Sequence, residues 1–188
     1  YKRQTTSRPA FDKLSMRRHP DGIVAVAPLW DTSLTRLQND LILAAESIEK
    51  PGNLGTVLRS ADCAGVSGVI VCDAGTDIHH PDVIRASVGA FFTVPIYQAT
   101  TEETLEWCLC HGIHTLAATP HSDQIYTSVD MRHAAAIVVG TEQYGLSRRW
   151  LDGADEQVKL PMFGKTNSLN VAMSATLLVY EAVRQRTT

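Results

Sequence analysis

The chain has 188 residues and a formal net charge of −3 at pH 7. Hydrophobic residues make up 44% of it and charged residues 20%, which is typical of a globular domain and excludes a collagen-like fibre or a disulfide mini-protein. The longest apolar stretches have the length of strands, whereas a membrane-spanning helix needs roughly 20 residues. The basic N-terminus is not followed by an apolar run of signal-peptide length. We therefore expect a single domain with no membrane partner.

Residues 1–21 are polar and basic. The first 18 residues have a local net charge of +5, because six basic residues oppose Asp12: Lys2, Arg3, Arg8, Lys13, Arg17 and Arg18. Since the sequence begins at Tyr1 without a methionine, we interpret residues 1–21 as a basic linker or the tail of a missing upstream domain. A solvated tail is the other interpretation of this charge. Residues 22–188 then form the main domain.

Four cysteines stand at positions that make no disulfide framework: Cys63, Cys72, Cys108 and Cys110. Nothing in the sequence points to secretion, so we expect a reducing compartment, the cytoplasm. Cys108 and Cys110 precede His111 and His114, but their spacing matches no common zinc motif. We interpret Cys108 as part of an amphipathic helix with Leu105, Trp107 and Leu109, and we expect no metal.

Short apolar runs alternate with helical patterns from residue 22 onward. We predict strands over 22–29, 40–47, 68–72, 94–97, 114–119, 134–140 and 157–160, and helices over 53–64, 81–90, 101–111, 147–152 and 168–186. Continuous apolar strands between helices indicate an α/β fold, with a mostly parallel sheet that helices cover on both faces.

The helix over 53–64 has one apolar face and one arginine outside it. Asn53 can cap the helix. Its core face contains Leu54, Val57, Leu58 and Ala61. Arg59 lies about 140° from the direction of Leu54, so it is not a core residue. It is either a solvated helix arginine or a guanidinium held next to an anionic ligand such as a phosphate.

Ligands of open α/β sheets gather at the carboxyl ends of the strands, so the loops that leave those ends are the candidate sites. Three of these loops are polar and rich in glycine, over 50–55, 140–147 and 161–170. Glu142 lies between Gly140 and Gly145, which suggests a tight turn around a ligand. Asn167 or Ser168 can cap the last helix. No strand is succeeded by G-x-G-x-x-G, so we reject a dinucleotide fold and interpret Asp73 as a turn residue.

The last predicted helix is apolar nearly all round. Its apolar residues run from Leu169 through Val171, Ala172, Met173, Ala175, Leu177, Leu178, Val179, Tyr180 and Ala182 to Val183. Such a helix must be buried on more than one side, either at a subunit interface or within its own chain.

Three segments together resemble motifs one, two and three of the SpoU (TrmH-type) RNA 2′-O-methyltransferases, over roughly residues 40–186. They are NLGTVLR at 53–59, GTEQYGLS at 140–147, and LPM at 160–162 followed by SLNV at 168–171. Each motif alone is weak, but the ordered set is specific. The resemblance implies the SPOUT class, whose C-terminal region forms a deep trefoil knot, an exception to the rule against threading. Residues 22–188 would then be a SpoU-type methyltransferase domain.

The resemblance also implies a cofactor and a set of site residues. The cofactor is S-adenosylmethionine, with no metal. Gly140, Leu160 and Leu169 match positions whose main chain holds it, and Thr119 matches a further contact on the adenosine side. Arg59 matches the catalytic arginine. Asn53, Glu142, Ser168 and Asn170 match polar residues that shape the site.

The function implied is methyl transfer to a ribose 2′-hydroxyl of a structured RNA. Ribosomal RNA is favoured over transfer RNA, because residues 11–28 resemble the join to an upstream substrate-binding domain. The resemblance implies a homodimer, which agrees with the apolar last helix. A guanidinium is not deprotonated near neutral pH, so we expect Arg59 to orient and stabilise charge. The alternative is a catalytically silent RNA-binding or assembly module on the same fold.

Overall fold

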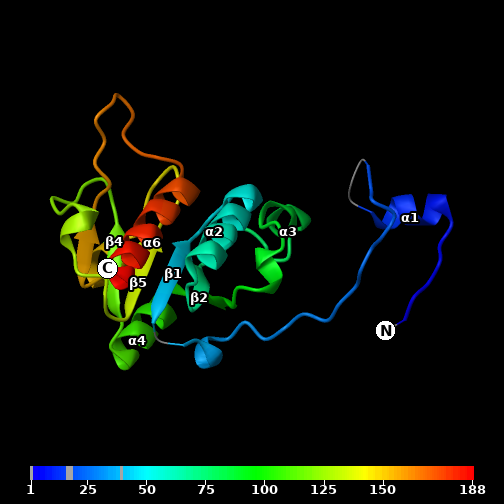
Figure 1. Ribbon diagram of the computed structural model, residues 1–188, viewed down its shortest axis with the longest axis horizontal. Coiled ribbons are helices and arrows are strands. Elements are labelled where there is room, and N and C mark those ends of the chain that lie inside the picture. Colours follow the sequence, from blue (N-terminus) through cyan, green and yellow to red (C-terminus); the bar gives the residue numbers. More distant parts are fainter. Residues whose placement is uncertain (1, 16–18, 39) are drawn as a thin grey trace. The chain divides into compact units, whose positions relative to one another are not determined.

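The computed structural model of the chain describes residues 2–15, 19–38 and 40–188 (Figure 1). It divides into two compact units, Tyr1–Asp31 and Thr32–Thr188. The first unit contains helix α1 (Arg8–Leu14), which has a proline in its first turn and buries no residue. Arg17 and Arg18 of the basic stretch, and Tyr1, lie outside the described residues. The remaining four basic residues of that stretch are exposed.

Residues 22–29 do not form the strand that their apolar character predicts. They are outside any helix or strand, and Ile23, Val26 and Leu29 are 84%, 95% and 73% exposed. A strand needs a neighbour to take up its backbone N–H and C=O groups, and an apolar run cannot supply that neighbour itself. The prediction of a strand here was wrong for this reason.

The second unit is built on a six-stranded sheet in the order β3-β2-β1-β5-β4-β6. Its strands are β1 (Leu41–Glu46), β2 (Gly68–Cys72), β3 (Ile96–Ala99), β4 (His114–Ala118), β5 (Ala135–Val139) and β6 (Glu156–Val158). All the strand pairs of this sheet run parallel. The expected mostly parallel α/β sheet is therefore confirmed, although β3 begins two residues later than predicted and β6 ends two residues earlier.

Helices cover both faces of the sheet, as the continuous apolar strands predicted. One face carries α2 (Pro51–Ala64), α3 (Pro81–Ala86) and α6 (Val171–Thr187), and the other carries α4 (Thr101–His111) and α5 (Arg148–Gly153). The 3-10 turns Leu34–Arg36, Ala90–Phe92 and Tyr126–Ser128 complete the elements. Side chains of β1 alternate between the faces: Leu43 packs with the α2 and α6 cluster, whereas Ile42 and Ala44 pack with the α4 and α5 cluster. Figure 1 shows α2 and α6 side by side.

Three helix boundaries differ from the prediction by two residues or more. Helix α2 begins at Pro51, and its N-cap Lys50 makes no side-chain cap, so Asn53 lies inside the helix rather than capping it. Helix α6 begins at Val171, where the Asn170 side chain caps it by accepting the N–H of Ala172 at 3.0 Å. Neither Asn167 nor Ser168 is the cap. Helix α3 stops at Ala86 because the chain soon enters left-handed backbone, ahead of the predicted end at residue 90.

Helix α6 is buried on one face and exposed on the other. Leu178 is fully buried in the core of its own chain, so it is not available to another subunit. Met173, Leu177 and Tyr180 are 54%, 43% and 44% exposed. This helix is therefore apolar on two faces, one packed in the core of its own chain and the other exposed to solvent. In the part of the chain that the structure describes, no helix has the length and apolar character needed to span a membrane.

The point where the strand order reverses lies between β1 and β5. These strands are neighbours, but the chain leaves β1 for α2 on one face and leaves β5 for α5 on the other. In open α/β sheets such a divergence opens a crevice at the carboxyl ends of the strands. The fold therefore places the β1–α2 and β5–α5 loops on the two sides of that crevice.

Candidate active site

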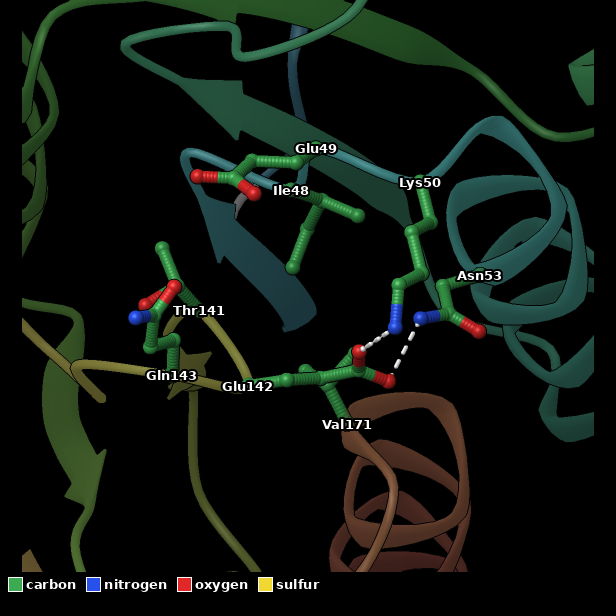
Figure 2. Close-up of a pocket in the computed structure, with 8 residues that line it drawn as sticks. All are labelled: Ile48, Glu49, Lys50, Asn53, Thr141, Glu142, Gln143 and Val171. Carbon is green, nitrogen blue, oxygen red and sulfur yellow. Dashed lines mark hydrogen bonds and ion pairs between the residues drawn. The ribbon is translucent and has the colours of Figure 1, made fainter.

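A pocket of about 360 Å³ occupies the crevice between the two loops (Figure 2). Its walls come from the β1–α2 loop, the β5–α5 loop and the first residue of α6. The lining residues are Ile48, Glu49, Lys50, Asn53, Thr141, Glu142, Gln143 and Val171. Ile48 and Val171 are buried and form an apolar part of the wall, and the polar side chains lie around them. The pocket is of the size that a small ligand or one unit of a polymer occupies.

Three of the predicted site residues meet beside this pocket, from segments far apart in the chain. The Asn53 amide donates to Glu142 Oε1 at 2.6 Å, and the Asn170 amide donates to the same oxygen at 2.5 Å. The Asn170 amide also lies 3.2 Å from Asn53 Oδ1. The structure thus joins one polar residue from each of the three sequence motifs around a single carboxylate.

Lys50 completes this group, although no sequence motif marks it as a site residue. Its Nζ lies 2.6 Å from Glu142 Oε2, and Figure 2 shows Lys50 and Asn53 reaching the two oxygens of the carboxylate. The Lys50 hydrogen bond is the main cause that lowers the pKa of Glu142 below its ordinary value, and Glu142 raises the pKa of Lys50 in turn. Opposite charges on two loops at the ends of neighbouring parallel strands could have indicated this pair.

The start of α2 explains why Asn53 is free to reach Glu142. Pro51 fits the first helical position, where its missing N–H is not needed. The helix therefore begins before Asn53, whose backbone N–H bonds to the Lys50 carbonyl at 3.0 Å. Its side chain is left to point into the crevice, as Figure 2 shows.

Glu142 is presented by a tight turn. Thr141 and Gly145 exchange backbone hydrogen bonds of 3.0 Å in both directions, and the Thr141 hydroxyl accepts the N–H of Tyr144 at 2.9 Å. Gly145 has φ +70°, a conformation that suits glycine. A Cβ on Gly140 would overlap the backbone of Gly145. The expectation of a tight turn between the two glycines is confirmed.

Arg59 does not join the group around Glu142. It is exposed on α2, as predicted, and the structure gives it no hydrogen bond or ion pair with another described residue. It lies six positions after Asn53, which places the two side chains about 120° apart around the helix and about 9 Å apart along it. Within one chain the two residues therefore face different directions.

Three of the four predicted cofactor residues lie at the carboxyl ends of three adjacent strands. Thr119 follows β4, is 6% exposed and donates its N–H to the Val158 carbonyl at 2.9 Å. Gly140 follows β5. Leu160 follows β6 and is half-buried against the core, and the loop then leads to Leu169, which is 41% exposed. Thr119, Gly140 and Leu160 therefore lie along one edge of the sheet, whereas Leu169 lies in the loop before α6, and none of the four lines the pocket beside Glu142.

The loop over 161–169 leads from β6 to α6 and is exposed over most of its length. It gives no backbone hydrogen bond to the other residues that the structure describes. Ser168 is exposed in this loop and is not part of the Glu142 group.

Within the run of cysteines and histidines over 108–114, the first residue has a structural role. Cys108 is buried in the core beside α5, whereas Cys110 and Leu109 are exposed, so the expected apolar face does not include Leu109. No group of three or more His, Cys, Asp and Glu side chains among the described residues is placed to hold a metal ion. Asp73 lies in a turn with φ +46°, and its carboxylate accepts the N–H of Thr101.

Comparison with known proteins gives one consistent family. Residues 40–180 match the model of the SpoU rRNA methylase family. A 23S rRNA (uridine(2479)-2′-O)-methyltransferase of Streptomyces viridochromogenes is 32% identical over 89% of this chain. A 23S rRNA (guanosine(2553)-2′-O)-methyltransferase of Bacillus subtilis (strain 168) is 27% identical over 93% of it. The chain spans 61% and 69% of the lengths of these two relatives.

Solved structures agree with the sequence relatives. The AdoMet-bound rRNA methyltransferase from Sinorhizobium meliloti superposes with a TM-score of 0.88 at 28% identity, covering 95% of this chain and 70% of that one. The SpoU methyltransferase AviRb from Streptomyces viridochromogenes, in complex with AdoMet, gives 0.81 at 31% identity over 85% and 64%. The match to the family model covers the six-stranded sheet and all three residues that meet at Glu142. The chain therefore belongs to the SpoU rRNA methylase family.

Proposed function

We propose that this chain methylates the 2′-hydroxyl of a ribose in a structured RNA, with S-adenosylmethionine as the methyl donor. The observation that carries the proposal is the meeting of Asn53, Glu142 and Asn170 on one carboxylate, because it joins the three motifs of the family at one point. Ribosomal RNA is the favoured substrate, since both curated relatives described above are named for 23S rRNA.

The cofactor and the RNA would lie on opposite sides of Glu142. S-adenosylmethionine supplies a methyl group that a ribose oxygen can attack. The main chain around Gly140, Leu160 and Leu169, with Thr119, would hold it in the trefoil knot that the family resemblance implies. None of these four residues lines the pocket of about 360 Å³ beside Glu142. This pocket is where we expect the target nucleotide, with its ribose next to Glu142.

Arg59 would act on the RNA rather than on the carboxylate group. A ribose hydroxyl is a weak nucleophile and loses its proton as it attacks. An exposed guanidinium holds a phosphate by two parallel hydrogen bonds and stabilises developing negative charge. Because Arg59 has no partner among the described residues, it is available for this role. Ser168, in the loop before α6, would contribute a hydroxyl from the cofactor side.

A homodimer through α6 would bring Arg59 close to a second site. Met173, Leu177 and Tyr180 recur at helical spacing on the exposed face of α6. Helix α2 packs against α6, with the hydroxyls of Ser60 and Thr176 2.7 Å apart. A second copy covering this stripe would therefore also approach the exposed side of α2 that carries Arg59.

The four cysteines are free, which supports a reducing compartment, the cytoplasm.

The test combines binding and methyl transfer. Calorimetry measures affinity for S-adenosylhomocysteine, and mass spectrometry counts the four 2′-O-methylnucleosides formed in unmodified ribosomal and transfer RNA. The wild-type protein should bind and methylate. Arg59→Ala should bind as the wild type does but lose methyl transfer, whereas the control Arg85→Ala, an exposed arginine on α3, should retain both. Binding without methylation of either RNA by the wild type would favour the silent module.

A further inference from the structure

Glu46 is a buried carboxylate that the proposed reaction does not use. It is the last residue of β1 and is only 5% exposed. By the alternation of the strand it faces the same side as Ile42 and Ala44, toward α4 and α5. A carboxylate is costly to bury unless hydrogen bonds replace its water, so its partners show what the position requires.

The partners of Glu46 lie at the starts of α4 and α5, at the same edge of the sheet. Glu46 Oε2 accepts the backbone N–H of Ser147 at 2.8 Å, and Oε1 lies 3.2 Å from the hydroxyl of Thr101. That hydroxyl has one proton and is 2.7 Å from Asp73 Oδ2, which also accepts the Thr101 N–H. The bond to Ser147 is thus the one that Glu46 does not share.

Ser147 is the far end of the loop that carries Glu142. It is the N-cap of α5, where its hydroxyl accepts the N–H of Trp150, and the loop runs back from it through Gly145 to Gly140. One end of this loop is fixed by its continuity with β5. The other end is fixed to β1 by the 2.8 Å bond to Glu46. Since the Glu142 group also spans β1–α2 and β5–α5, a shift of Ser147 would move Glu142 relative to Asn53.

We propose that Glu46 is a positioning residue: its side chain, by accepting the N–H of Ser147, fixes the 140–147 loop so that Glu142 meets Lys50 and Asn53 and the Gly140 main chain faces the cofactor. This extends the proposed function and rests on it for its kinetic consequences. What matters is the reach of the side chain to Ser147 rather than its negative charge. Length and charge can be separated by substitution.

Glu46→Gln keeps the length and removes the charge. Its amide oxygen can accept the Ser147 N–H while its NH₂ group donates to Thr101, whose own proton then serves Asp73. Glu46→Asp keeps the charge but shortens the side chain by one methylene, so that it no longer reaches Ser147. Glu181→Asp is the matched control, because Glu181 is also buried, at 8% exposure, and bonds to Arg184 and Gln185 on α6.

Amide hydrogen exchange over residues 140–147 is measured first, because it needs no ligand. Exchange should be as slow in Glu46→Gln as in the wild type and faster in Glu46→Asp. Affinity for S-adenosylhomocysteine should fall about 10-fold in Glu46→Asp, as expected for the loss of one hydrogen bond of about 1–1.5 kcal/mol. In methyl transfer, this variant should show a larger change in kcat than in the KM for RNA. Glu181→Asp should leave the exchange of this loop and the affinity unchanged.

Two results would overturn the proposal. In one, Glu46→Asp exchanges and binds like the wild type. In the other, Glu46→Gln or Glu181→Asp is impaired as much as Glu46→Asp, which would mean that charge or general stability is responsible. A wild-type protein that binds no S-adenosylhomocysteine would instead refute the proposed function, and the exchange data would still decide the role of Glu46.

Discussion

Glu142 takes hydrogen bonds from three side chains while 27% of its own side-chain surface stays exposed. An exposed ion pair alone contributes little to stability. Here the carboxylate also receives two amide donors, which hold it in one orientation. At the scale of single residues, this arrangement therefore acts by positioning more than by stabilisation, because it fixes where the ends of α2 and α6 meet the β5–α5 loop.

The charge state of this group predicts a pH dependence. The pKa of Glu142 lies below its ordinary 4.5, so its contribution to folding is present above pH 4.5 and is lost as the pH falls through the lowered pKa. The pKa of Lys50 lies above 10.5, so its contribution is present below pH 10.5 and is lost as the pH rises through the raised pKa. Between these limits the stability difference between wild type and Glu142→Gln should be constant.

Urea unfolding over the range from about pH 3 to about pH 11 measures that difference. The wild-type advantage should shrink below pH 4.5 and again above pH 10.5. Glu106→Gln is the control, because Glu106 is exposed on α4 and has no hydrogen bond to another described residue. An advantage that changes most near neutral pH would exclude the Lys50–Glu142 pair as its source.

Gly140 gives a second prediction at the same scale. A Cβ there overlaps the backbone of Gly145, so Gly140→Val must push the 140–147 turn apart. We expect this variant to lose S-adenosylhomocysteine binding in calorimetry and to lose about 1–3 kcal/mol of unfolding free energy, the usual cost of overpacking. Gly52→Ala is the control, since a Cβ at Gly52 meets nothing within 4 Å and this glycine lies in α2, outside the 140–147 turn. Wild-type affinity in Gly140→Val would argue against a cofactor held by this turn.

At the scale of elements, α2 holds the site because α3 packs tightly against it. A Cβ on Gly55 would lie 2.5 Å from the Val83 carbonyl oxygen and 2.6 Å from the Ala86 Cβ. Gly55→Ala should therefore destabilise the protein by about 1–3 kcal/mol in urea unfolding. Gly52→Ala, on the same helix with nothing within 4 Å of its Cβ, should be neutral or stabilising by roughly 0.5–1 kcal/mol. If the two substitutions changed the free energy of unfolding equally, α3 would be able to move away from the new Cβ without a measurable cost.

The elements that the sequence predicted best are those whose boundaries are set locally. Helix α4 matches its predicted range because the Thr100 and Glu103 capping box starts it and Gly112, with φ +64°, ends it. Helix α6 was misplaced at its start because three polar residues before it could each cap, and only the folded position of Asn170 selects one. The strand over 22–29 failed because strand formation depends on a neighbour that lies elsewhere in the chain.

The site shows the same division between local and long-range information. Asn53, Glu142 and Asn170 were found through motifs, and the structure brings them together. Lys50 was missed because its role comes from Glu142, which is 92 residues away. Arg59 was correctly placed outside the core by helical periodicity. The same helical periodicity makes Arg59 and Asn53 face different directions on α2. The sequence pattern of one chain therefore cannot predict how these two residues would be arranged around one substrate.

At the scale of the whole molecule, the exposed stripe on α6 predicts self-association. Leu177→Glu and Tyr180→Glu place a charge on the stripe without touching the core, unlike Leu178, which is fully buried in its own chain. Both variants should sediment as monomers, whereas the wild type should sediment as a dimer at micromolar concentration. The control is Leu109→Glu on α4, where the leucine is 82% exposed and should not alter the dimer. A monomeric wild type would refute the interface.

The four thiols allow the folding of the whole second unit to be followed. Cys63 and Cys110 are exposed, whereas burial raises the pKa of Cys72 and of Cys108 to about 12. The thiolate is the reactive form, so at about pH 8 the buried pair should be alkylated only after the protein opens. Mass spectrometry should therefore find two rapidly labelled cysteines and two that label together slowly.

Ligand binding should change only the slow pair. A ligand that binds the folded state alone adds about 2.7 kcal/mol of stability at about 100 times its Kd, which slows labelling through unfolding about 100-fold. S-adenosylhomocysteine should thus protect Cys72 and Cys108, although each lies on the α4 face of the sheet, and leave the rates of Cys63 and Cys110 unchanged. If S-adenosylhomocysteine slowed the labelling of only one of these two cysteines, β2 and α4 would open separately. The sheet edge that holds the cofactor and the helices on the α4 face would then not unfold as one unit.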